Sequence, residues 1–305
     1  MIRRIGFVVL SLLSIGLVAA WWLSRPLAIL AEDLPDYAPD PVKGERVFWA
    51  GGCASCHATP VDGRRAAGQD KLQLGGGMQL DTPFGIFRVP NISSHETDGI
   101  GRWSMVEFVN AMQHGVSPSG EHYYPSFPYP SYARMDVEDV MDLRVYLETL
   151  PAVGRRSAGH SLSLPWSLRR GVGLWKRRYM DSDPVVPIDA SNHELMRGRE
   201  IVEGVGHCGE CHSPRDRFGG PIMKRWLAGA ASLEGQGRVP NITRAGSNVK
   251  EWTQEDIVYY LESGFTPDFD TVGGTMVAVQ ENMAMLPASD REAVAAYLKY
   301  IPAVE

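Results

Sequence analysis

The segment from Gly51 to Pro60 reads GGCASCHATP, and the segment from Gly206 to Arg215 reads GHCGECHSPR. Both contain the pattern C-x-x-C-H, and the chain of 305 residues has no cysteine outside these two patterns. Two disulfides would be the ordinary expectation for four cysteines in an oxidising compartment. The identical spacing, with a histidine directly after each pair, argues against disulfides. Zinc would need two more ligands for each pair, and neither segment supplies them nearby.

The pattern C-x-x-C-H is the attachment signature of c-type haem. Its two thiols bond covalently to the porphyrin, and its histidine becomes an axial ligand of the iron. The sequence therefore predicts two covalently attached haem c groups. The residues expected to hold them are Cys53, Cys56 and His57 for the first group and Cys208, Cys211 and His212 for the second.

The similarity between the two segments extends well beyond the cysteines. RVPNI at Arg88–Ile92 recurs unchanged at Arg238–Ile242, and YLETLPAV from Tyr146 is matched by YLKYIPAV from Tyr297. The offset between matching residues stays between 149 and 155. Self-similarity at a steady offset indicates two copies of one folding unit. We expect an N-terminal segment at 1–30, cytochrome c domains at 38–153 and 191–305, and a linker at 154–190.

Each copy has the sequence pattern of a small helical unit. Ser104 with Glu107, and Thr253 with Asp256, have the spacing of a capping box at the start of the middle helix. The last helix is expected at about 137–150 in the first copy and at about 290–301, after Ser289, in the second. The predicted fold class is all-α, a tandem duplication of cytochrome c-type haem domains with an N-terminal transmembrane helix. Loops such as 59–90 are expected to wrap the haem.

The second axial ligand decides what each iron can do. A methionine sulfur favours electron transfer, whereas an open position favours oxygen or peroxide chemistry. In the first copy the candidate is Met135, just before the last helix, and in the second any of Met276, Met283 and Met285 could reach the iron. Isolated histidines are the competing ligands, although they are more often solvated; they are His95, His114, His122, His193 and His207.

The repeated RVPNI string suggests a supporting role beside each C-x-x-C-H histidine. An iron-bound imidazole usually donates its other ring N–H to a carbonyl group, which fixes the orientation of the ring. The carbonyl groups of Pro90 and Pro240 are the predicted acceptors. The alternative is a simple turn that persisted after the duplication.

The chain begins with an apolar stretch. Arg3 and Arg4 precede an apolar run from Ile5 to Leu23, which is close to the ~20 residues needed to cross a bilayer. Trp21 and Trp22 stand at its far end, as is typical of a membrane interface. We expect an uncleaved anchor in the inner (cytoplasmic) membrane, with the haem domains in the periplasm. A cleaved signal peptide is the alternative.

Charge excludes one class of partner and singles out one segment. The net charge of −6 is mild and spread along the chain, so we expect no nucleic acid partner, which would need a basic face. The most basic part is 154–188, where Trp166 and Trp175 are interleaved with Lys and Arg. It either docks to an acidic partner or anionic lipid, or packs its tryptophans across both haem domains and leaves its charges solvated. The second interpretation is favoured.

The stretch from Thr82 to Met135, which includes TPFGIFRVPNI and YPSFPYPSYARM, resembles the cytochrome c subunits of membrane-bound periplasmic alcohol, gluconate and aldehyde dehydrogenases. The second copy is similar through RVPNIT and GGTMVAVQENMAML. This resemblance implies Met276 as the sixth ligand in the second copy, ahead of the other two methionines. Some relatives carry a methionine where this chain has Phe127. Phenylalanine cannot bind iron, so Met135 stays the candidate ligand in the first copy. The well-known subunits have three C-x-x-C-H motifs, and this chain has two.

The resemblance implies an electron-transfer subunit, with no catalytic residues of its own. We expect a periplasmic dihaem c-type cytochrome that takes electrons from the catalytic subunit of a dehydrogenase. It would pass them to the respiratory chain through quinone, another cytochrome or an oxidase. Two alternatives stay open: a dihaem peroxidase, which needs one open iron position, and a cytochrome c subunit of a terminal oxidase complex.

Overall fold

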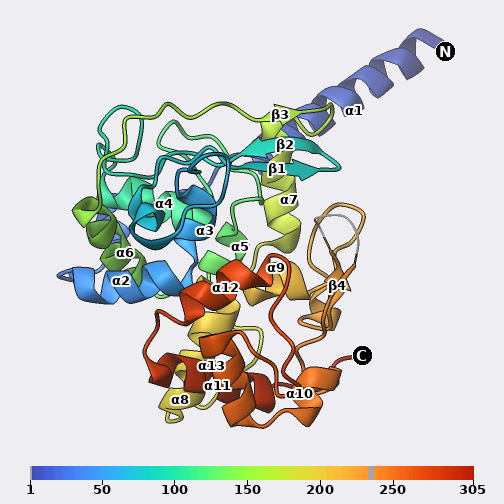
Figure 1. Ribbon diagram of the computed structural model, residues 1–305. Helices are drawn as coiled ribbons and strands as arrows, with labels where there is room; N and C mark the ends of the chain where they lie inside the picture. The colour runs from blue at the N-terminus through green and yellow to red at the C-terminus, as the bar shows by residue number, and fades with distance from the viewer. Residues whose placement is uncertain (1, 233–236) are drawn as a thin grey trace.

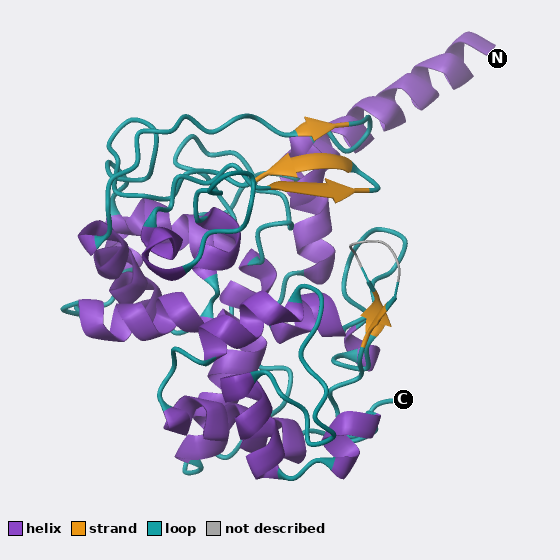
Figure 2. Cartoon of the chain, in the orientation of Figure 1, coloured by secondary structure: helices purple, strands orange, loops and turns teal. Residues whose placement is uncertain are grey.

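The computed structural model describes residues 2–232 and 237–305, and helices are its main regular elements, with long loops between them, as Figure 1 and Figure 2 show. We call residues 38–153 the first half and residues 191–305 the second half. The helices of the first half are α2 (Pro41–Ala50), α3 (Cys53–His57), α4 (Met105–His114), α5 (Tyr129–Tyr132) and α6 (Val137–Thr149). Those of the second half are α8 (His193–Arg199), α9 (Cys208–His212), α10 (Ser247–Glu251), α11 (Gln254–Ser263), α12 (Met276–Met283) and α13 (Ala288–Tyr300).

In each half, the helix ahead of the C-x-x-C-H segment crosses the last helix at a glycine. Helix α2 packs against α6, and α8 packs against α13. A Cβ atom at Gly44 would lie 2.1 Å from the carbonyl oxygen of Asp142, and one at Gly198 would lie 2.1 Å from that of Ala293. Because glycine has no Cβ, the two helix backbones can approach this closely. The same crossing therefore occurs in both halves.

Both predicted capping boxes are present. The N–H of Ser104 donates to the carboxylate of Glu107 at 2.8 Å, and the N–H of Thr253 donates to Asp256 at 2.8 Å. Helix α6 also lies close to its predicted range. The start of α13 is a correction, because the helix begins at Ala288 and not after Ser289. The extended conformation of Pro287 (φ −61°, ψ 152°) directly precedes its first turn.

The second half carries one residue more than the first between the matching crossing glycine and the C-x-x-C-H histidine. The structure takes up this residue in η4 (Glu200–Val205), a π-helical turn. Here the N–H of Gly206 donates to the carbonyl of Ile201, five residues back, at 2.7 Å. Such wide single turns occur frequently at functional sites. The extra residue is absorbed locally, directly ahead of α9.

Two small sheets are an addition to the predicted all-α class. Strands β1 (Gln79–Thr82) and β2 (Gly85–Arg88) form an antiparallel hairpin inside loop 59–90, and β3 (Ser161–Leu162) of the linker pairs with β2. Strands β4 (Ala230–Ala231) and β5 (Arg238–Val239) form the second sheet. Runs this short give no reliable alternation in a sequence. The third strand also comes from a distant segment, so local pattern could not predict the sheet.

The linker packs across both halves. Trp166 lies against Phe84 of the first half, with ring centroids 4.8 Å apart, and Trp175 donates to the carbonyl of Phe218 of the second half at 3.0 Å. The predicted packing of the tryptophans is confirmed. The charges are not all solvated, because Lys176 of α7 (Val172–Tyr179) donates to two carbonyls at the end of α4, at 2.6 and 2.7 Å. Burial lowers the pKa of Lys176 to about 7.

Helix α1 (Ile2–Leu23) projects from the body (Figure 1). Its stretch from Arg4 to Leu23 is not buried anywhere in the body, and has the length and apolar composition of a membrane-spanning helix or of a signal sequence. The C-terminal end of α1 is fixed to the first half, because His122 Nε2 donates to the carbonyl of Ser24, directly after the helix, at 2.8 Å.

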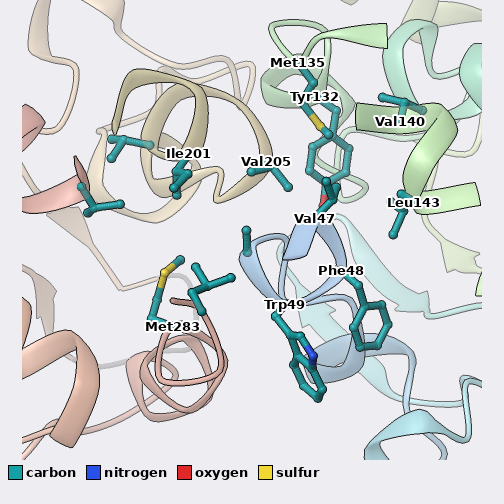
Figure 3. Packing of buried hydrophobic residues seen from close by; sticks show 14 of the residues in the cluster. Val47, Phe48, Trp49, Tyr132, Met135, Val140, Leu143, Ile201, Val205 and Met283 are labelled. Atoms are coloured by element: carbon teal, nitrogen blue, oxygen red, sulfur yellow. The ribbon is translucent and has the colours of Figure 1, made fainter. Parts of the chain in front are cut away.

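Buried apolar side chains of both halves form one continuous core. Figure 3 shows part of this core, where Val47 of α2 and Tyr132 of α5 face Val205 of η4 and Met283 of α12. Val205 and Met283 are each 3 % exposed. Such burial removes apolar surface of both halves from water and so stabilises their contact. The two halves therefore meet in a packed junction.

Charged side chains also cross the junction. Asp290 of α13 is 1 % exposed and accepts from Arg46 of the first half at 2.8 Å and from Arg197 of the second at 3.0 Å. Burial by itself raises the pKa of Asp290, but the hydrogen bond and charge of Arg197 outweigh it and lower the pKa. Asp139 of α6 lies 3.9 Å from Arg197, and burial raises its pKa to about 6 although the guanidinium opposes this.

Replacing Asp139 with asparagine is expected to raise the free energy of unfolding at neutral pH by about 1–2 kcal/mol. The pKa of this carboxyl is higher in the folded than in the unfolded protein. Its contribution to stability is therefore fully present below the unfolded pKa of about 4, where the group is protonated in both states. That contribution is lost as the pH rises through about 6. Asparagine has no charge to desolvate, so the gain should shrink on acidification to about pH 4, which urea unfolding at the two pH values measures.

Asp136→Asn is the matched control, because this exposed residue precedes α6 and asparagine is an equally good residue at a helix start. A gain of the same size in both variants would rule out burial of Asp139 as the cause.

Candidate functional site

Each C-x-x-C-H segment forms one helical turn behind a residue in the left-handed conformation. Helix α3 follows Gly52 (φ 59°), and α9 follows His207 (φ 41°). Residues three or four positions apart lie on the same face of a helix. The two thiols and the imidazole of each segment therefore share one face. A planar ring bound through two of its substituents and through its central metal requires this arrangement.

The imidazoles of His57 and His212 are held in the same way. The Nδ1–H of His57 donates to the carbonyl of Pro90 at 2.8 Å, and that of His212 donates to Pro240 at 2.8 Å. The hydrogen bonds predicted from the repeated RVPNI string are thereby confirmed. Burial lowers the pKa of His57 to about 4 and also lowers that of His212. Both rings are neutral near pH 7, so each Nε2 keeps a lone pair for a metal ion.

The loops that carry the two proline carbonyls are tied down by asparagines. Asn91 Nδ2 donates to the carbonyl of Val153 at 2.7 Å, and Asn241 Nδ2 donates to that of Val304 at 2.7 Å. Each bond joins an RVPNI string to the PAV string after the last helix. Sequence reasoning missed this role, although asparagine follows the proline in both copies. The asparagines fix the carbonyl that orients each histidine.

The candidate methionines differ in burial. Met135 is 6 % exposed and lies at the junction, with its Cγ 3.3 Å from the position that a Cβ would take at Gly204 of the second half. Met283 is buried at the end of α12, and Met276 is half-buried at its start, where it packs against the core. Met285 is 57 % exposed. An axial ligand must be enclosed with its haem, so Met285 is the weakest candidate.

Three of the histidines considered as competing ligands form hydrogen bonds to the backbone. His122 and His207 each donate from Nε2 to a backbone carbonyl, at 2.8 and 3.3 Å. The Nδ1 of His95 accepts a backbone N–H at 3.1 Å. His193 is exposed at the start of α8, and His114 ends α4. Methionines are therefore the better axial candidates.

Reciprocal hydrogen bonds join each C-x-x-C-H segment to the other half. Ser131 Oγ of the first half donates to Glu210 of α9 at 2.8 Å, and Asn282 Nδ2 of the second half donates to Ser55 of α3 at 2.7 Å. Ser131 and Asn282 are matching residues of the repeat. Ser55 and Glu210 match as well, because each stands directly before the second cysteine. Both segments therefore lie at the junction, and Cys53 and Cys208 pack against the core that Figure 3 shows in part.

The donor set fits covalently attached haem better than zinc. Within residues 2–232 and 237–305, no three His, Cys, Asp or Glu side chains gather in the manner of a metal cluster. Each segment instead presents two thiols and one neutral imidazole on one face. The buried indole N–H of Trp49, just ahead of the first segment, also lacks an acceptor among the described residues. Oxygen atoms of a bound group would satisfy such a donor.

Comparison with known proteins also favours covalently attached haem over zinc. Residues 41–151 match the family model described as cytochrome c. A protein named diheme cytochrome c-type, from Cereibacter sphaeroides, is 47 % identical over 296 residues, which are 97 % of this chain and 97 % of that protein.

Cytochrome subunits of dehydrogenases are also similar. The fructose dehydrogenase cytochrome subunit of Gluconobacter japonicus is 33 % identical over 270 residues, or 88 % of this chain and 54 % of the subunit. The cytochrome c subunit of the quinone alcohol dehydrogenase of Gluconacetobacter polyoxogenes is 31 % identical over 273 residues, or 86 % of this chain and 56 % of the subunit. The chain thus spans about half the length of these dehydrogenase subunits.

Proposed function

Because the chain belongs to the cytochrome c family, we propose that it is an electron carrier with two haem sites, which works between a dehydrogenase and the respiratory chain. The observation that carries the proposal is the pair of equivalent histidines. Each follows two cysteines on one helical turn, and each is held 2.8 Å from a proline carbonyl. One such site would make a cytochrome, and two in one chain make an internal relay.

The two halves are proposed to be duplicated cytochrome c domains, at 38–153 and 191–305, each with one covalently bound haem c. Four repeated features support this: the glycine crossing, the capping box, the histidine–proline bond and the asparagine that ties RVPNI to PAV. Chance similarity in one feature would not extend to the other three. The linker 154–190 then joins two units of equivalent construction.

Each haem, once bound, supplies one-electron chemistry at its iron. The residues that bind the iron decide whether it only transfers electrons or also reacts with oxygen or peroxide. His57 and His212, both neutral, would each bind one haem iron through Nε2, and the proline carbonyls that accept their Nδ1–H keep the rings from turning. Met135 and Met276 are the residues proposed to supply a thioether ligand to the first and the second haem iron, respectively. A thioether ligand would favour the reduced state and would leave no open position for oxygen or peroxide.

The junction is proposed to let the two sites exchange electrons directly. The reciprocal bonds from Ser131 to Glu210 and from Asn282 to Ser55 hold both attachment segments against the opposite half. His207 adds a bond to the carbonyl of Gly51, so the residues ahead of the two segments also touch. Short separation between redox groups favours transfer within one molecule. A rigid junction keeps that separation constant.

The proposed partner is the catalytic subunit of a periplasmic dehydrogenase, and the proposed acceptor is a quinone, another cytochrome or an oxidase. The names of the similar fructose and alcohol dehydrogenase subunits support the first partner. The proposed location is the periplasmic face of the inner membrane, with α1 retained as the anchor. The length and apolar composition of α1 support an anchor.

Visible spectra of the purified full-length protein test the carrier function against peroxidase activity. We expect both irons to be low-spin when oxidised and when reduced, with spectra unchanged by carbon monoxide. Two one-electron waves should appear in a redox titration. A high-spin iron that binds carbon monoxide, together with turnover of hydrogen peroxide, would contradict the proposal and support a peroxidase.

A further inference from the structure

The C-terminal end of α1 is capped by arginines that come from the linker. The last turn of α1 has no basic residue of its own. Arg170 donates to the carbonyl of Trp21 at 2.8 Å and to Ser24 Oγ at 3.0 Å, and Arg177 donates to the carbonyl of Leu23. The helix macrodipole favours cations at this end. The arginines therefore fix the direction in which α1 leaves the body.

Tryptophans and arginines surround the same end of α1. The guanidinium of Arg25 lies 4.5 Å from the ring centroid of Trp22, and that of Arg170 lies 5.2 Å from the ring centroid of Trp21. Both rings are exposed, at 50 and 66 %, respectively. Tryptophan at the end of an apolar helix favours the membrane interface, and arginine there attracts anionic lipid. The base of α1 thus has the chemistry of the headgroup layer.

The loop at 163–168 carries exposed apolar side chains next to this base. Leu164 is 75 % exposed and Leu168 is 61 % exposed. Leu168 stands two residues before Arg170, so chain continuity keeps it close to the arginines that cap α1. Figure 1 shows the loop between β3 and α7 on the side of the body from which α1 projects. Apolar and cationic groups therefore occur together around the anchor.

We propose that loop 163–168 and the arginines around the base of α1 form a second membrane contact, which lies in the headgroup layer of a bilayer that contains anionic phospholipid. The two leucines enter the boundary between headgroups and acyl chains. Arg25, Arg170 and Arg177 pair with lipid phosphates. The inference depends on one part of the proposed function, namely that α1 is retained as a membrane anchor. A body held at two points cannot rotate freely about α1, so both haem sites keep a fixed height above the membrane.

Charge and position favour a bilayer over a protein as the occupant of this surface. The chain has a net charge of −6, which an anionic surface repels, yet exposed arginines gather where α1 leaves the body. A membrane around α1 would also reach the adjoining loop without further conformational change. A protein docked on the same loop would compete with the headgroups for that space.

Hydrogen–deuterium exchange of the full-length haem-loaded protein in lipid nanodiscs tests the inference. We compare discs of phosphatidylcholine alone with discs that also contain phosphatidylglycerol. The amides of 163–168 should exchange more slowly in the wild type than in the Leu164→Glu, Leu168→Glu double variant. Anionic lipid should slow the exchange of these amides further. Arg25→Gln should reduce that additional slowing by about fivefold, which corresponds to the binding free energy that one arginine contributes near an anionic surface.

Phe269→Glu is the matched control, because it also adds a charge at a large exposed side chain, 91 % exposed, but in the second half. It should leave the exchange of 163–168 unchanged. Equal exchange in the wild type and the double variant in both kinds of disc would overturn the inference. Slowing only after a dehydrogenase subunit is added would also overturn it, in favour of a protein partner. An unchanged haem spectrum in each variant shows that the electron carrier itself is intact.

Discussion

Replacing Gly198 with alanine is expected to destabilise the protein strongly and to lower the yield of its folded, haem-loaded form. The new Cβ would lie 2.1 Å from the carbonyl oxygen of Ala293 and 2.6 Å from the Cβ of Tyr297. Neither atom is the flexible end of a side chain, so α8 and α13 would have to separate. Overpacking of this kind costs about 3 kcal/mol or more, out of a total stability of about 5–15 kcal/mol.

Thermal unfolding and haem content of the purified variant measure the effect. Gly44→Ala should have the same consequence, because its Cβ would lie 2.1 Å from the carbonyl of Asp142 at the equivalent crossing. Gly273→Ala is the control, since a Cβ there meets nothing within 4 Å. A Gly198→Ala protein with the wild-type melting temperature would show that the crossing is looser than described.

Replacing Met276 with alanine is expected to convert one of the two haems from low to high spin without loss of covalent attachment. The thioether ligand raises the potential of an iron that it binds. Its loss should lower the midpoint potential of that haem by more than about 0.1 V, since axial ligands tune haem potentials over ≈ 0.8 V. Visible spectra and a redox titration of the variant measure both changes.

Met285→Ala is the control in the same stretch, because its side chain is largely exposed and should leave both spectra unchanged. If Met276→Ala leaves both irons low-spin, the proposed ligand is wrong and Met283, which is buried, is the next to replace. The equivalent test in the first half is Met135→Ala, which should change the spectrum of the other haem.

The repeated local patterns were the part of the structure that the sequence predicted well. Ser104 and Glu107 form their capping box because both partners lie within one turn, and the same holds for Thr253 and Asp256. The bond from His57 to Pro90 was predicted from the repetition of RVPNI together with the needs of an iron ligand. Local spacing and known ligand chemistry were sufficient for these features.

Features that join distant segments could not be predicted. Met135 packs against Gly204, 69 positions along the chain (204 − 135), and β3 completes a sheet with a hairpin far ahead of it. The bonds of Ser131 and Asn282 across the junction depend on how the two halves meet. Each of these contacts is weak by itself and leaves no periodic signal in the sequence.

Intact mass spectrometry of the protein, purified from cells that attach haem to cytochromes c, counts its covalently bound haem groups. We expect the mass of the polypeptide plus two haem groups. Digestion should place one group on the peptide with Cys53 and Cys56 and the other on the peptide with Cys208 and Cys211. The mass of the bare polypeptide, or of one haem only, would contradict an electron carrier built from two equivalent haem sites.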